Sequence, residues 1–163
     1  MDVNFNKAEA EWIPLIGQFI LDFAFIEDSI HTVISDYLNK SLIKESYLSD
    51  RIETRIELFE EIIKASDAQD GTKIKSLTAE IKNLRPTRNL LAHNALGLVY
   101  EEKEGVLKEI GFEITAKKKT TSIKLDSLKK QAARLTKCRD QLTEVMIIFL
   151  RERFKAYERE LPH

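Results

Sequence analysis

Apolar residues recur three and four positions apart along the first forty residues of the chain. This spacing places them on one side of an α-helix, so we predict a helix from Ala8 to Leu38, about 45 Å long at 1.5 Å per residue. A second apolar line, at intervals of seven, lies beside the first, and Glu27 occupies one position in it. The two lines consist of Trp12, Ile16, Phe19, Phe23, Ile26, Ile30, Val33 and Tyr37, and of Ile13, Ile20 and Ile34.

The middle of the chain predicts two further helical segments. The first runs from about Asp50 to Ala65 and is followed by a polar loop at Ser66 to Thr72. Helical spacing returns near Lys73 and continues toward Leu96, but Pro86 lies within it and lacks the N–H that a helix interior needs. Either one helix ends near Arg85 and another starts at Pro86, or a single helix is kinked. The apolar side of the first segment consists of Ile52, Ile56, Phe59, Ile62 and Ile63.

From Gly97 the apolar period changes from helical to two, which is typical of β-strands. We expect a hairpin or a three-stranded insertion over about residues 97–125, with turns at 101–105 and 116–121. Asp126 or Ser127 then caps a last helix that reaches about Glu160. The alternating residues are Leu98, Tyr100, Ile110, Phe112, Ile114, Ile123 and Leu125; the helix stripe is Leu128, Ala132, Leu135, Leu142, Val145, Phe149 and Phe154.

These elements predict an all-α fold, a four- to five-helix bundle with two long helices and a small β insertion, as one domain over residues 1–163. The low content of helix breakers, 5 Gly and 3 Pro, agrees with it. A formal net charge of −1 gives no general basic field, so contact with nucleic acid requires a local patch. The chain has one cysteine, Cys138, which fits a reducing compartment. It shows no signal-peptide pattern and no apolar run of membrane-spanning length. We therefore expect a cytoplasmic protein without a membrane partner.

One polar cluster, Arg85 to Asn94, stands out as candidate chemistry. On a helix Arg85, Asn89 and His93 share a face, while Arg88 lies about 60° from Arg85 and about 140° from His93. A guanidinium can bind phosphate oxygens through two hydrogen bonds, so this face is a candidate phosphate site. His31, His93 and His163 are far apart and show no metal-ligand spacing, and we expect no metal and no cofactor.

The pattern Arg88-Asn89-x-x-x-His93 resembles the active-site motif of the HEPN ribonucleases. The resemblance implies a helical bundle that dimerises across the motif and cleaves RNA without a metal, by attack of a 2′-hydroxyl on the neighbouring phosphorus. In that chemistry His93 would transfer protons, Arg88 would stabilise charge on the phosphate, and Asn89 would orient one of them. One chain offers one such histidine, so a homodimer becomes part of the mechanism.

The family also suggests partners, and the sequence itself suggests supporting residues. Toxin and phage-defence enzymes of this kind act on RNA, and an antitoxin or a defence-system protein is a possible partner. Glu27 could orient Arg88 or Arg85, and Lys117, Lys118 and Lys119 could contact RNA. The chain differs from the HEPN family pattern in two respects. Ala95 stands where HEPN toxins paired with a nucleotidyltransferase carry tyrosine, and the β insertion is absent from the plainest HEPN bundles.

Other interpretations of the same residues stay open. The chain could be a HEPN-like module without catalysis that binds RNA, a nucleotide or a protein, or a dimeric bundle with a structural role only. His93 could be a histidine at a helix end whose ring nitrogens have ordinary hydrogen-bond partners, with Arg88 in a surface ion pair. Glu27 could lie at a solvated rim, and Lys117 to Lys119 could form a solvated turn.

Overall fold

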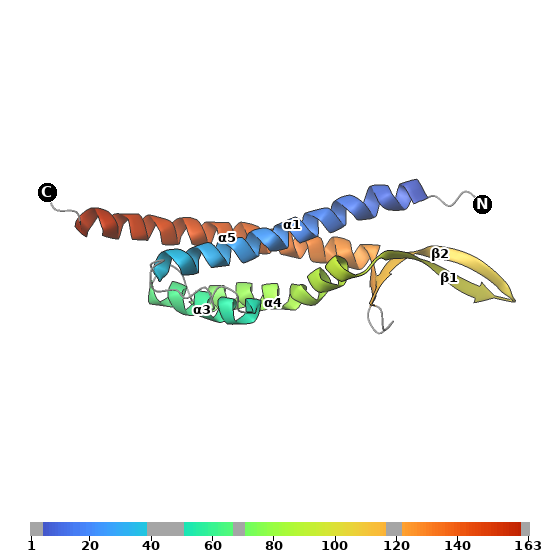
Figure 1. Cartoon of the computed structure of the whole chain (residues 1–163), viewed down its shortest axis with the longest axis horizontal. Helices are drawn as coiled ribbons and strands as arrows, with labels where there is room; N and C mark the ends of the chain where they lie inside the picture. Colours follow the sequence, from blue (N-terminus) through green and yellow to red (C-terminus); the bar gives the residue numbers. More distant parts are fainter. Residues whose placement is uncertain (1–4, 39–50, 67–70, 117–121, 161–163) are drawn as a thin grey trace. The chain divides into compact units, whose positions relative to one another are not determined.

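The chain is mainly helical, with one small antiparallel sheet between its last two helices (Figure 1). The structure is a computed structural model that describes residues 5–38, 51–66, 71–116 and 122–160. Its elements are α1 (Phe5–Tyr37), α3 (Ile52–Ala65), α4 (Gly71–His93), β1 (Leu96–Lys103), β2 (Val106–Thr115), β3 (Ser122–Lys124) and α5 (Leu125–Glu160). The predicted helical class and the place of the β insertion are therefore confirmed.

The chain divides into two compact units. Unit 1 comprises Met1–Asp22 and Leu84–Thr136, and unit 2 comprises Phe23–Asn83 and Lys137–His163. Helices α1, α4 and α5 each contribute residues to both units, and each unit has a set of buried apolar side chains. The organisation of residues 1–163 as one domain stays a prediction.

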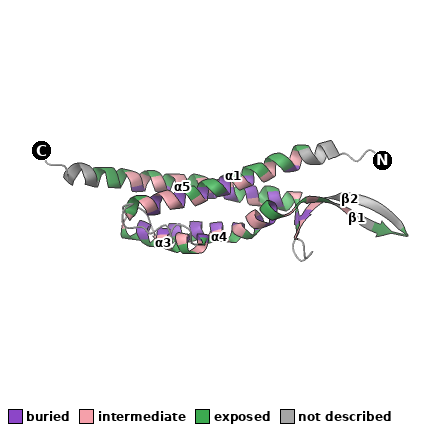
Figure 2. Cartoon of the chain, in the orientation of Figure 1, coloured by how far each residue is buried: buried purple, intermediate pink, exposed green. Residues whose placement is uncertain are grey.

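Unit 2 is built mainly from apolar helix faces. All five residues predicted for the apolar side of α3 are buried, which confirms that stripe. A polar contact joins α3 to α4, where the hydroxyl of Thr78 donates to Glu60 and Lys82 forms an ion pair with Glu60 at 3.7 Å. The buried apolar side chains are Phe23, Ile26, Ile30, Val33, Ile34, Ile52, Ile56, Phe59, Ile62, Ile63, Ile74, Leu77, Ile81, Cys138, Leu142, Val145 and Phe149 (Figure 2).

Unit 1 joins helix segments to the sheet. Ile114 of β2 and Ile123 of β3 lie opposite each other across the strand pair, and both are buried. Because neighbouring side chains on a strand point to opposite faces, this pair marks the face of the sheet that is covered. The buried apolar side chains of the unit are Trp12, Phe19, Leu84, Leu90, Leu91, Ile114, Ile123, Leu128, Ala132 and Leu135.

The sheet has the order β1-β2-β3, and both strand pairs are antiparallel. β1 and β2 form a hairpin whose two central residues, Glu104 and Gly105, have φ of 55° and 76°. Positive φ at both positions is the requirement of a type I′ turn, the two-residue turn that fits strand twist. Pairing then shifts between Val99 and Tyr100, which leaves Ile110 of β2 as an extra residue, a β-bulge.

Several predicted boundaries were wrong by a few residues. α4 begins at Gly71 and continues through Pro86 to His93, so the two-helix alternative was wrong. Leu125 is the first residue of α5 rather than a strand residue, because β3 passes into the helix without a loop. Asp126 consequently lies in the first helical turn, where its negative charge suits the helix dipole, and does not cap the helix.

None of the described helix segments is long and apolar enough to cross a membrane.

Some residues of the predicted stripes are not in a core. Phe154 is 68% exposed, because the described side chains of α5 from 151 to 155 are all on the surface. Ile13 is 58% exposed, since one residue of helix rotation turns it away from its buried neighbour Trp12. Tyr37 is also exposed, at the end of α1.

Candidate functional site

The motif residues occupy the last turns of α4, within unit 1. Arg85, Arg88 and Asn89 are half-buried, whereas His93 is exposed and is the last residue of the helix. Leu84, Leu90 and Leu91 of the same segment are buried. The helix therefore holds its leucines in the core of unit 1 and keeps the motif side chains in contact with solvent.

The structure brings Arg88 and Asn89 together. An Nη atom of Arg88 donates to Oδ1 of Asn89 at 3.4 Å, a long hydrogen bond between neighbouring residues. Within the described part of the chain no hydrogen bond or ion pair joins Arg88 to His93. At 100° per residue the two side chains leave the helix about 140° apart. The two proposed catalytic groups, Arg88 and His93, are thus five residues apart and directed to different sides of one helix.

The end of α4 is closed by Asn94, whose side-chain amide donates to the carbonyl of Leu90 at 2.9 Å. The last carbonyls of a helix have no backbone partner within it, so a side-chain donor at this position satisfies one of them. The bond fixes where the helix stops, and His93 lies on its last turn as a result. Leu96 begins β1 three residues later.

A buried polar contact anchors the motif helix to α5. The hydroxyl of Thr87 donates to Oε1 of Gln131, and Nε2 of Gln131 donates to the hydroxyl of Ser127 at 3.3 Å. Thr87 is buried although it is polar. This contact was not predicted, although the sequence contains a signal for Thr87. Thr87 is three residues after Leu84 and four before Leu91, and so shares their side of the helix.

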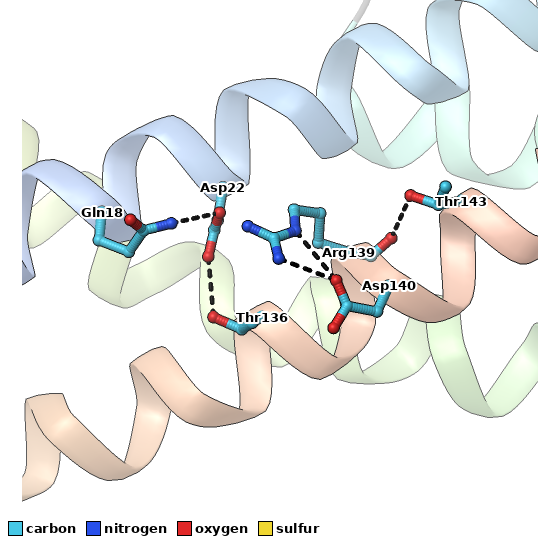
Figure 3. Close-up of polar contacts among 6 residues, drawn as sticks. All are labelled: Gln18, Asp22, Thr136, Arg139, Asp140 and Thr143. Carbon is cyan, nitrogen blue, oxygen red and sulfur yellow. Dashed lines mark hydrogen bonds and ion pairs between the residues drawn. The ribbon is translucent and has the colours of Figure 1, made fainter.

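A second buried polar group in unit 1 is Asp22, only 3% exposed. Its carboxylate accepts a hydrogen bond from Nε2 of Gln18 at 2.7 Å and another from the hydroxyl of Thr136 at 2.9 Å (Figure 3). The bond to Thr136 joins α1 to α5. Asp22 was also missed, although it lies between Phe19 and Ile26 on the side of α1 that the apolar spacing marks as buried.

The remaining predicted site residues lie in unit 2 or outside the described residues. Glu27 is half-buried on α1 and belongs to unit 2, so its proposed contact with Arg85 or Arg88 stays a prediction. Lys117, Lys118 and Lys119 lie outside the described residues. Over the residues that the structure describes, no three His, Cys, Asp or Glu side chains gather as a metal site requires.

Comparison of the chain with protein-family models, with curated proteins and with solved structures gives no match. The resemblance to HEPN ribonucleases consequently rests on the motif residues and on the order of the helices in this chain.

Proposed function

We propose that the protein is a metal-independent endoribonuclease with a HEPN-like fold, of the toxin or phage-defence type. The observation that carries the proposal is that Arg88, Asn89 and His93 lie on the last turns of α4 outside its buried leucines, with Arg88 and Asn89 half-buried and His93 exposed, while Leu84, Leu90 and Leu91 are buried. A cation near the C-terminus of a helix also stabilises that helix by about 0.3–1 kcal/mol, so the pattern Arg88-Asn89-x-x-x-His93, and not the positive charge alone, supports the proposal.

The reaction needs few groups. A base removes the proton of the 2′-hydroxyl, the oxygen attacks the adjacent phosphorus, and the 5′-oxygen leaves with a proton from an acid. The products are a 2′,3′-cyclic phosphate and a 5′-hydroxyl. A histidine side chain can give and take protons near neutral pH, which suits His93 to this transfer. The guanidinium of Arg88 can hold the crowded phosphate, where negative charge builds up.

A homodimer supports this chemistry better than one chain. One chain supplies a single histidine at the motif, whereas the reaction has both a base and an acid. The angle of about 140° between Arg88 and His93 further separates the two groups within one helix. If two motif helices face each other, Arg88 of one protomer can lie beside the partner's histidine. The composite site would then have two histidines and two guanidinium groups.

The second candidate is a HEPN-like module that binds RNA, a nucleotide or a protein without cleaving it. The observation in its favour is the contact between Arg88 and Asn89, which occupies part of the guanidinium within the motif itself. A binding site needs that charge but does not need His93 to reach the same phosphate.

The experiment that separates the two candidates uses purified protein and end-labelled single-stranded RNA in EDTA. Cleavage that leaves a 2′,3′-cyclic phosphate is expected for the wild type, and His93→Ala should be slower by about 10²–10⁴-fold, the usual contribution of proton transfer. His31→Ala is the matched control, since His31 is a half-buried histidine of unit 2 and should keep full activity. Undiminished cleavage by His93→Ala would end the catalytic interpretation.

A further inference from the structure

The hydrogen bond between Thr87 and Gln131 establishes which sides of two helices face each other in unit 1. α4 enters the sheet at its C-terminus and α5 leaves the sheet at its N-terminus, so the two segments run antiparallel (Figure 1). Thr87 and Gln131 mark the line of contact between them. Every other residue on either segment can be assigned to one side of this line from its rotation of 100° per residue.

One side of the line is the core of unit 1. On α4, Leu84 and Leu91 lie about 40–60° from Thr87 in one direction, and on α5 Leu128 and Leu135 lie about 40–60° from Gln131. All four are buried, so both helices turn these sides toward the same interior. Leu90 is also buried and lies about 60° from Thr87 in the other direction, so the buried part of α4 extends past the contact line. Because the two helices are antiparallel, the sides of α4 and α5 that lie beyond these buried residues also fall on one common surface, opposite the interior of unit 1.

That opposite surface carries His93 and two exposed basic side chains. His93 lies about 120° from Thr87 on the side away from Leu84 and Leu91. Arg134 and Lys130 lie about 60° and about 100° from Gln131 on the side away from Leu128 and Leu135. All three are exposed. Arg88, in contrast, leaves α4 on the core side of the contact line, about 100° from Thr87.

The three residues are spread along the direction of the helices. At 1.5 Å per residue, His93 lies about 9 Å from the level of Thr87 toward the sheet, and Lys130 about 1.5 Å in the same direction. Arg134 lies about 4.5 Å the other way, so the row extends over about 14 Å. A polynucleotide strand advances about 3.4 Å per nucleotide in a stacked duplex and further when it is extended, so the row is longer than one nucleotide step.

The charge of unit 1 agrees with an anionic ligand. Residues 1–22 and 84–136 contain 12 Lys and Arg against 10 Asp and Glu, a net charge of +2, whereas the other unit has 14 against 17, a net charge of −3. The neighbouring Lys129 is not part of the row, because it leaves α5 about 160° from Gln131 and reaches Glu11, with which it forms an ion pair at 3.0 Å. Lys130 and Arg134 thus place positive charge on the same surface as His93, in the unit with the more positive net charge.

We infer that Lys130 and Arg134 bind the phosphate backbone of a single-stranded RNA and lead the strand to His93. This inference rests on the proposed function, since it names the substrate contacts of the same site. A single strand is favoured because attack by a 2′-hydroxyl requires the leaving oxygen to lie opposite the attacking one. A flexible strand reaches this arrangement, whereas a duplex holds its backbone away from it.

The test measures RNA binding in the absence of cleavage. In a His93→Ala background, Lys130 and Arg134 are both replaced by Gln, and affinity for a fluorescent oligouridine is followed by anisotropy over a range of salt concentrations. Each lost phosphate contact on a single strand should reduce the slope of log K against log salt by about 0.7, so a reduction of about 1.4 is expected. Affinity at low salt should fall at least about tenfold.

A matched pair of lysines in unit 2 controls for net charge. Lys64→Gln with Lys75→Gln removes two exposed positive charges as well, and should leave both affinity and slope unchanged. A substrate in which the same RNA is paired with its complement should bind more weakly than the single strand.

The outcomes separate this inference from the proposed reaction. If the wild type cleaves RNA but the Lys130 and Arg134 variant keeps full affinity and slope, or if both pairs of substitutions act alike, the binding row is wrong and the reaction stands. If the wild type never cleaves RNA but only the Lys130 and Arg134 variant loses affinity, the reaction is wrong and the row stands. No binding of RNA by the His93→Ala protein, or equal binding of the duplex, overturns the inference.

Discussion

The two compact units of this protein bury different kinds of side chain. Unit 2 has a nearly continuous set of Ile, Leu, Val and Phe residues from four helices, with Ser29 and Thr78 as its buried polar groups among the described residues. Unit 1 contains both helix segments and strands but has a smaller set of buried apolar residues. Asp22 and Thr87 are buried among them.

This difference teaches which part of the molecule supplies stability and which part supplies position. Apolar packing is strong but has no direction, whereas a hydrogen bond fixes the rotation of one helix relative to another. Unit 1 uses two such bonds, Thr87 to Gln131 and Thr136 to Asp22, near the segment that carries Arg88 and His93. Unit 2 also has such a bond, from Thr78 to Glu60, but its larger set of buried apolar side chains makes packing its main source of stability.

The largest expected effect tests the stabilising role of unit 2. Phe59 on α3 is completely buried, so Phe59→Ala should lower the free energy of unfolding by about 3–5 kcal/mol. In a chain of this length each kcal/mol changes Tm by about 2–4 °C, which thermal denaturation followed by circular dichroism detects. Phe154→Ala, the same substitution at a side chain that is 68% exposed, should stay within about 0.5 kcal/mol of the wild type. Equal losses in the two variants would contradict the proposed division.

A second prediction concerns Arg88, which should matter more for RNA than for stability. Arg88→Ala removes a bidentate charge, and hydrogen bonds to charged groups are worth about 1.5–3 kcal/mol, so RNA affinity should fall by about ten- to a hundredfold. Arg88→Lys should restore part of it, because an ammonium keeps the charge but not the planar fork. Anisotropy and calorimetric melting on the same samples give both quantities. A fall in Tm with unchanged RNA affinity would place Arg88 among the structural residues.

The third prediction addresses the buried carboxylate of unit 1. Asp22→Ala removes the acceptor of the hydrogen bonds from Gln18 and Thr136, and should cost about 1–3 kcal/mol of unfolding free energy in urea denaturation. Asp36→Ala is the control, since Asp36 forms an exposed ion pair with Arg153 and such pairs contribute about 0–1 kcal/mol. If Asp22→Ala is as stable as Asp36→Ala, Asp22 does not anchor α1 to α5.

Some features of the fold follow from the sequence alone, and others do not. The stripe of α3 and the alternation that leads to Ile114 and Ile123 were predicted correctly, because helical and strand periodicity follow from backbone geometry alone. Phe154 was wrongly assigned to a core, since periodicity tells which side of a helix is apolar but not where its packing partners end.

The candidate site was predicted only in part for a related reason. Spacing along α4 identifies the relative directions of Arg88, Asn89 and His93, and this needs no tertiary information. Which of these directions faces α5 depends on a contact between Thr87 and Gln131, 44 residues apart. The spacing from Leu84 and Leu91 places Thr87 on the buried side of α4, but nothing in the sequence identifies Gln131 as its partner.

The smallest effects compare two glycines of unit 1 that have opposite roles. Gly105 has φ of 76° in the type I′ turn, a conformation in which a Cβ collides with the following carbonyl, so Gly105→Ala should destabilise the protein by about 1–2 kcal/mol. Gly17 lies in α1, where an added Cβ would meet no atom within 4 Å. Gly17→Ala should therefore stabilise by about 0.5–1 kcal/mol, because alanine loses less backbone entropy on forming a helix. Urea denaturation of both variants beside the wild type measures the two signs in one experiment. A loss of stability in Gly17→Ala would mean that another molecule, such as a second copy of the chain, packs against α1 at this glycine. A neutral Gly105→Ala would mean that the hairpin turn can change its conformation without cost, and that the sheet contributes little to the stability of unit 1.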